Sequence, residues 1–97
     1  MFRHVVLFKW TDAATEEQKR NVFAQLARLP EAIPELKAYH FGPDAGINAG
    51  NYDFAVVADF VDRAGYLSYR DNPVHRAVID EAITPIRADR AAVQYEL

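Results

Sequence analysis

The stretch YDFAVVADFV (residues 52–61) decides the fold, because its aromatic and β-branched residues alternate at the two-residue period of a β-strand. One face of this strand carries Tyr52, Phe54, Val56, Ala58 and Phe60. The other face carries Asp53, Ala55, Val57, Asp59 and Val61. Both faces contain apolar residues, whereas a strand with one face in water is polar on that face. The stretch therefore predicts a strand that is covered on both sides.

A second strand of the same kind opens the chain at residues 2–10 (FRHVVLFKW). Its first face carries Phe2, His4, Val6, Phe8 and Trp10. Its second face carries Arg3, Val5, Leu7 and Lys9. Apolar residues again occupy both faces, so this strand is expected beside the first one in the interior of a sheet.

Helix signals follow both strands. Thr15 and Gln18 have the spacing of a capping box, which predicts a helix that begins there and ends before Pro30 and Pro34. Asp62 is placed to cap a short helix over residues 63–70, and Asn72-Pro73 starts another. The apolar stripe of that last helix, which Pro85 bends or ends, comprises His75, Val78, Ile79, Ala82, Ile83 and Ile86.

The remaining segments complete the element order. Residues 36–42 read as a strand, residues 43–51 (PDAGINAGN) as a mobile loop that is the best lid candidate, and residues 91–97 as a closing strand. The order strand, helix, strand, strand, helix pair, strand predicts an α+β domain of the ferredoxin-like, split βαβ kind, with a four-stranded antiparallel sheet. A chain of 97 residues forms a single domain, spanning 1–97.

One face of the predicted sheet is out of reach of the helices of its own chain. Val5, Leu7, Ala55 and Val57 form an apolar patch on this face. A second copy of the sheet is the simplest cover for such a patch. We therefore expect a homodimer in which the two sheets pack face to face.

Composition excludes several classes of function. Eleven basic and fourteen acidic residues give a net charge of -3, which argues against nucleic acid as a partner. No cysteine is present to form a disulfide, a thiolate metal site or a nucleophile. Neither a signal peptide nor a membrane span is recognisable, so a cytoplasmic location and no membrane partner are expected.

Three side chains are candidates for chemistry. His75 lies near the start of the last helix, where the helix dipole disfavours the imidazolium ion and favours a neutral base. Tyr69 could donate a hydrogen bond to a developing oxyanion, and His4 shares an apolar strand face with Val6 and Phe8. The alternative for each is a structural role in the core. The three histidines lack metal-binding spacing, and Gly46 and Gly50 form no phosphate-binding motif.

The whole chain resembles the stress-responsive A/B barrel (Dabb) family of dimeric α+β barrels. The resemblance is carried by RHVVLFKW, LPEAIPELKAYHFG, YDFAVVADF, YLSYRDNPVHRAV and VQYEL. His4 and the segment from Asn72 to His75 are the most specific matches, although the family typically has histidine where this chain has Asn72. Phe54 likewise replaces a pocket histidine of the polyketide cyclases in this family.

The resemblance implies a cavity between the sheet and the helices. Its polar residues are His75, Tyr69 and His4, and its apolar substrate contacts are Val6, Phe8, Phe54, Tyr66 and Val78. Similar loops in some members hold magnesium or sodium through backbone carbonyls, which by register are those of Pro30, Ile33 and Leu36. An ordinary proline-containing turn is the alternative for that loop, and the cyclases themselves use no cofactor.

Three functions remain open on this evidence. The first is a cofactor-free enzyme like the polyketide cyclases, in which His75 removes a proton next to a carbonyl, Tyr69 stabilises the oxyanion and His4 orients or polarises the substrate. The second is a non-catalytic, stress-related homodimer that binds an apolar small molecule. The third is a cofactor-free monooxygenase of the antibiotic-biosynthesis kind.

Overall fold

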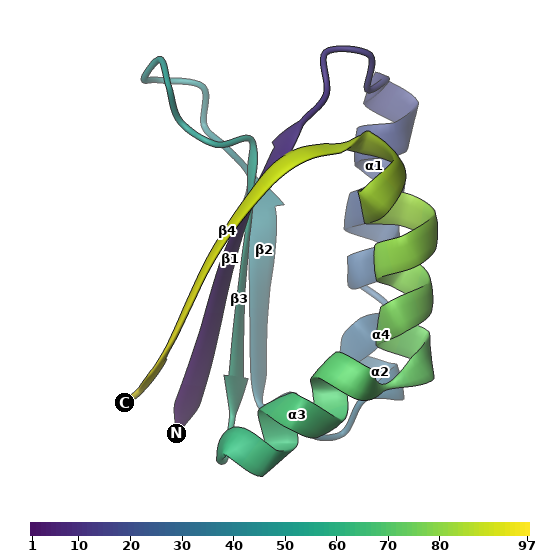
Figure 1. Cartoon of the computed structure of the whole chain (residues 1–97). Helices are drawn as coiled ribbons and strands as arrows, with labels where there is room; N and C mark the ends of the chain where they lie inside the picture. Colours follow the sequence, from purple (N-terminus) through teal and green to yellow (C-terminus); the bar gives the residue numbers. More distant parts are fainter.

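A computed structural model describes all residues from 1 to 97. The chain forms, in order, β1 (Phe2–Trp10), α1 (Glu16–Leu26), α2 (Leu29–Ala32), β2 (Ala38–Pro43), β3 (Phe54–Phe60), α3 (Arg63–Asp71), α4 (Pro73–Val78) and β4 (Arg87–Glu96). A π-helical turn (Ile79–Ile83) and a 3-10 turn (Thr84–Ile86) connect α4 to β4. The four strands make one antiparallel sheet in the order β2-β3-β1-β4, and the helices cover one face of it (Figure 1). The predicted ferredoxin-like fold is confirmed.

The two strands that were predicted first lie in the middle of the sheet. We call the sheet face under the helices the inner face and the opposite one the outer face. Val6 pairs with Val56 on the inner face, and Val5 pairs with Val57 on the outer face. The inner faces are buried along their whole length under the helices. Val22 and Leu26 of α1, with Ile83 and Ile86 after α4, supply the other side of this core. The alternation in the sequence thus places the core correctly.

Each predicted helix start is confirmed by its capping hydrogen bond. The backbone N–H of Gln18 donates to the Thr15 hydroxyl at 3.1 Å, and the Gln18 side chain accepts from the Thr15 N–H at 2.9 Å. The Asp62 carboxylate accepts from the N–H of Gly65 at 3.0 Å at the start of α3. The Asn72 side chain accepts from the N–H of Val74 at 2.9 Å and separates α3 from α4.

The last strand starts four residues earlier than predicted, at Arg87 instead of residue 91. The 3-10 turn around Pro85 ends the helical segment sharply, and the chain enters the sheet at once. Arg87 pairs with Trp10 and Asp89 with Lys9, so Ala88 is an extra, bulged residue in β4. Polar residues at this strand start obscured it in the sequence. β2 is likewise displaced, to residues 38–43.

The outer face of the sheet has no helix over it. Val5, Leu7, Ala55 and Val57 are half-buried there, and Val93 of β4 is 58% exposed. Arg3 donates two hydrogen bonds to the Asp59 carboxylate, at 2.7 and 2.8 Å, at one margin of this face. None of the helices is long and apolar enough to cross a membrane.

Candidate functional site

A cavity of about 310 Å³ lies between the inner face of the sheet and the segment from α3 to the π-helical turn. All three candidate catalytic residues, His4, Tyr69 and His75, line it. The remaining lining residues are Val6, Phe8, Leu26, Tyr39, Val56, Tyr66, Arg70, Arg76, Ile79, Ile83, Arg87 and Arg90. Three segments that are far apart in the sequence thus bring these residues to one cavity, and their catalytic roles stay a prediction.

Two of the expected contacts lie elsewhere. Phe54 is at the start of β3, outside the cavity, with its ring centroid 5.9 Å from that of Trp10. Val78 lines a surface hollow between α1 and α4. Ile79 lines the cavity in its place, because a residue four positions after His75 faces nearly the same way on a helix. Val6, Phe8 and Tyr66 do line the cavity, as expected.

His75 is held as a neutral base. Its Nδ1 lies 3.2 Å from the backbone carbonyl of Arg70, and a carbonyl only accepts, so Nδ1 carries the proton. The second ring nitrogen, Nε2, then has a free lone pair. Burial lowers the pKa of His75, against the effect of the bond to Arg70, so the neutral form is favoured. A lone pair on a neutral imidazole can accept a proton from a substrate.

His4 is held in the opposite tautomer. The amide nitrogen of Gln94 lies 2.9 Å from His4 Nδ1, and an amide nitrogen only donates, so Nδ1 accepts and Nε2 carries the proton. Burial, with smaller contributions from the charges of Arg90 and His75, lowers the pKa of His4 to about 4. His4 is therefore a neutral hydrogen-bond donor at pH 7. One cavity thus holds an imidazole with a lone pair and another with a donor.

Tyrosine rings connect the two histidines. The Tyr66 ring centroid lies 4.9 Å from that of His4, and the Tyr69 ring centroid lies 4.0 Å from that of His75. The hydroxyls of Tyr69 and Tyr39 are 3.3 Å apart. Burial raises the pKa of both phenols, that of Tyr39 to about 12, so both remain protonated donors. The cavity can therefore present a hydroxyl to a substrate oxygen that gains negative charge.

Several lining residues were missed by the sequence analysis. Tyr39 belongs to β2, whose alternation was too short to assign a face. Arg87 and Arg90 precede the predicted start of the last strand, so their face in the sheet was not considered. Gln94, the partner of His4, lies on that strand directly opposite His4. Correct assignment of the β4 start was the signal that could have identified Arg87 and Arg90. Gln94 lies within the predicted strand, and only the pairing of that strand with β1 shows that it faces His4.

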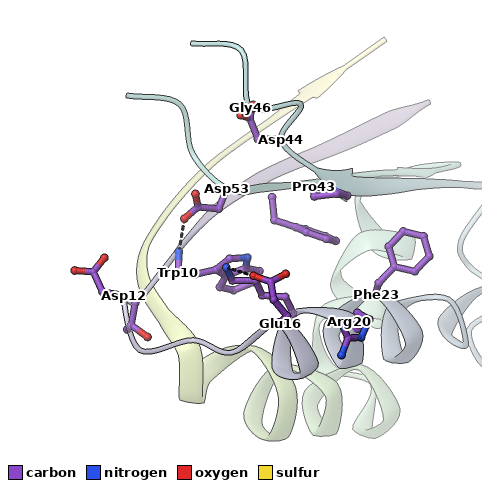
Figure 2. Close-up of a pocket in the computed structure, with 12 residues that line it drawn as sticks. Trp10, Asp12, Glu16, Arg20, Phe23, Pro43, Asp44, Gly46 and Asp53 are labelled. Carbon is purple, nitrogen blue, oxygen red and sulfur yellow. Dashed lines mark hydrogen bonds and ion pairs between the residues drawn. The ribbon is translucent and has the colours of Figure 1, made fainter. Parts of the chain in front are cut away.

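A larger open hollow of about 700 Å³ lies at the other end of α1, and Figure 2 shows its lining. Asp12, Arg20 and Asp44 are among its exposed residues. Asp53, at the base of the 43–51 loop, accepts a hydrogen bond from the Trp10 N–H at 2.7 Å in this region. The loop borders this hollow. None of the loop residues lines the cavity that contains His4 and His75, so the expected lid does not cover the candidate site.

The expected ion site gains little support from the geometry. The carbonyl of Ile33 already accepts a hydrogen bond from the N–H of Leu36 at 3.2 Å. Pro34 has no N–H to offer the carbonyl of Pro30, so this oxygen lacks the donor that a helix would place four residues later. Mg²⁺ prefers about six oxygens in octahedral geometry, and no group of three or more acidic or histidine side chains is placed to complete such a shell. The ion site at these carbonyls stays a prediction.

The family model of the stress responsive A/B barrel domain matches residues 2–97, and the chain belongs to this family. A dimeric ferredoxin-like protein of unknown function from Thermobifida fusca is 52% identical, with 99% of this chain and 90% of that chain covered and a TM-score of 0.92. The search of curated proteins finds no match.

Two enzymes share the fold at low identity. The hydroxynitrile lyase from Passiflora edulis is 21% identical, with 99% of this chain and 92% of that chain covered and a TM-score of 0.86. An antibiotic biosynthesis monooxygenase is 12% identical, with 100% of this chain and 98% of that chain covered and a TM-score of 0.78. At these identities the likeness concerns the fold and says nothing about the reaction.

Proposed function

We propose that the cavity binds a small, mostly apolar carbonyl compound and catalyses proton transfer at the carbon next to the carbonyl, as in an aldol-type ring closure. The observation that carries this proposal is the pair of opposite tautomers of His75 and His4 in one cavity. A base and a donor in the same water-poor site are the two groups that enolisation needs.

Each catalytic residue has a distinct role in this proposal. His75 Nε2 takes the proton from carbon, and its Nδ1–H bond to the Arg70 carbonyl keeps the ring oriented. Tyr69, whose ring contacts that of His75, donates its hydroxyl proton in a hydrogen bond to the developing enolate oxygen. His4 polarises the acceptor carbonyl through its Nε2–H. The enolate carbon then attacks this carbonyl and closes the ring. The proton that His75 took from carbon passes to the new alkoxide, and His75 returns to its neutral form.

The test is a screen of linear polyketide thioesters and activated methylene ketones, scored as cyclisation above the spontaneous rate. His75→Ala should reduce turnover about 10²- to 10⁴-fold, as loss of a general base does. Tyr69→Phe should reduce it less, because the ring and the base remain. Arg28→Gln is the control, since Arg28 is exposed and lies outside both the cavity and the sheet, and this variant should retain wild-type turnover.

Two results would contradict the catalytic proposal. If no substrate is accelerated and His75→Ala lowers the melting temperature by several degrees, His75 is structural and the cavity belongs to a small-molecule binding protein. Oxygen uptake with quinol or anthrone-like compounds, in place of cyclisation, identifies a monooxygenase.

We also propose that the protein is a homodimer whose protomers pack through the outer faces of their sheets. Val5, Leu7, Ala55 and Val57 form the uncovered apolar centre of that face. The 52% identical relative from Thermobifida fusca is described as dimeric. Burial of such a patch against a second copy removes it from water and stabilises the fold.

A further inference from the structure

We infer that the natural ligand of the cavity carries a carboxylate, which Arg87 and Arg90 of β4 hold at the edge of the site. The inference rests on the proposed function in one respect, that the cavity binds a small molecule. It adds the charge and the orientation of that molecule. It does not depend on which reaction follows.

The lining of the cavity is one-sided in charge. Four arginines line it, namely Arg70, Arg76, Arg87 and Arg90, and no aspartate or glutamate does. The chain as a whole has the opposite balance, with fourteen acidic and eleven basic residues. We call these four arginines the positive rim of the cavity. On a protein of net charge -3, they attract anions to the cavity.

Two of the four arginines have a carboxylate partner and two do not. Arg70 pairs with Asp71 at 2.8 Å, and Arg76 lies 4.0 Å from Asp80. Arg87 and Arg90 form no ion pair and no side-chain hydrogen bond. Their charges are therefore available to a ligand, and an anion between them would relieve the repulsion of two neighbouring cations.

A bulge in β4, in which Ala88 is the extra residue between Arg87 and Asp89, places both free arginines on the cavity side. In a regular strand, residues three positions apart face opposite sides of the sheet. The register shift between Lys9 and Trp10 lets Arg87 pair with Trp10 while Arg90 pairs with Phe8, and both partners belong to the buried inner face. A bulge commonly redirects a side chain toward a functional site in this way.

The chemistry of the site favours a carboxylate on a flat, apolar body. The planar guanidinium group matches the two oxygens of a carboxylate and binds them with paired hydrogen bonds. The aromatic rings of Phe8, Tyr66 and Tyr69 line the same cavity and suit a planar ligand. Arg90 acts electrostatically on His4, so a carboxylate at Arg90 lies close to the donor that faces the reacting carbonyl.

The test compares two ligands of nearly the same shape, 2-naphthoate and the neutral 2-naphthamide. Binding is measured by isothermal titration calorimetry. Wild-type protein should bind the naphthoate at least about tenfold more tightly, the effect of a charge-assisted hydrogen bond. Added salt should weaken the naphthoate affinity selectively.

Arginine variants locate the carboxylate. Arg90→Gln and Arg87→Gln should each weaken naphthoate binding about tenfold and leave naphthamide binding unchanged. Arg28→Gln is the matched control, because it removes one exposed positive charge outside the cavity and should leave both affinities as in wild type. Melting temperatures of all variants establish that they are folded.

Several outcomes overturn the inference. It is wrong if the amide binds as tightly as the acid, if the variants weaken both ligands equally, or if wild type binds neither. It is also wrong if 1-naphthyl phosphate binds more tightly than the naphthoate, since the rim would then be a phosphate site. If neutral ketones are cyclised while wild type binds the naphthoate no more tightly than the naphthamide, the carboxylate is rejected and the proposed function stands.

Discussion

The rings of Tyr69 and His75 lie 4.0 Å apart, centroid to centroid, at an angle of 36°. Tyr69 is near the end of α3 and His75 is in the first turn of α4, so the contact crosses the break between two helices. Asn72 makes that break, with an extended backbone conformation (ψ 129°) and a side chain that caps α4. A hydroxyl donor and a base are thus brought together by a single capping residue.

The first prediction concerns that capping residue. Asn72→Ala should lower the free energy of unfolding by about 1 kcal/mol through loss of the cap. It should also reduce turnover, because the first turn of α4 positions His75. Asn72→Ser, which keeps a capping oxygen, should restore both properties. Urea unfolding and initial rates measure them, and a loss of stability with unchanged turnover in Asn72→Ala would rule out a positioning role.

The second prediction concerns the hydroxyl pair of Tyr39 and Tyr69, which are 3.3 Å apart. Tyr39→Phe and Tyr69→Phe should each cost about 1 kcal/mol of stability, because each leaves a buried hydroxyl without its partner. The double variant should cost little more than either single one, since the same hydrogen bond is lost only once. Thermal unfolding of wild type, the two single variants and the double variant gives a double-mutant cycle for this hydrogen bond. Additive losses would show that the two hydroxyls are not bonded to each other.

The third prediction concerns acid stability. Burial lowers the pKa of folded His4 to about 4, below the ordinary value of 6.5. Between these two pH values the unfolded chain binds a proton that the folded chain does not, so the free energy of unfolding rises with pH across this window. The contribution of His4 reaches about 3 kcal/mol above pH 6.5 relative to pH 4. The pKa of His75 is also lowered by burial, so His75 likewise makes the free energy of unfolding rise with pH.

Denaturant unfolding at pH 4.5, 5.5 and 7 measures this dependence. His4→Leu removes the titrating group, so its stability should fall less than that of wild type between pH 7 and pH 4.5. Arg28→Gln serves as the control, because Arg28 is exposed and lies outside the cavity and the sheet, and this variant should follow wild type. Parallel curves for wild type and His4→Leu would show that burial of His4 does not govern acid stability.

The fourth prediction concerns the proposed dimer. Val57→Arg places an unpaired charge at the centre of the outer sheet face, where desolvation of a guanidinium is costly. Sedimentation should therefore change from dimer to monomer or unfolded chain. Val74→Arg, on the helical layer, is a matched control that should remain dimeric. A stable native monomer of the wild-type protein at micromolar concentration would refute packing through the sheets.

Much of the fold follows from short-range patterns in the sequence. The alternation along β1 and β3 assigned their buried faces correctly, because successive side chains of a strand must point to opposite sides. Thr15, Asp62 and Asn72 marked helix starts, because each satisfies a free backbone N–H with its own side chain. These rules act within a few residues, so the linear sequence contains all the information they need.

The sequence by itself also predicted that His4 and His75 face each other, from the strand face and the helix stripe that carry them, and the family resemblance added Tyr69; all three line one cavity. Only the tertiary structure decided their chemical states. The Arg70 carbonyl selects one tautomer of His75, and Gln94, ninety positions from His4, selects the other tautomer there. The sequence alone also left the positive rim unseen, because it depends on a strand register shifted by a bulge. Tautomers and registers are set by contacts between distant segments, and local patterns carry no information about such contacts.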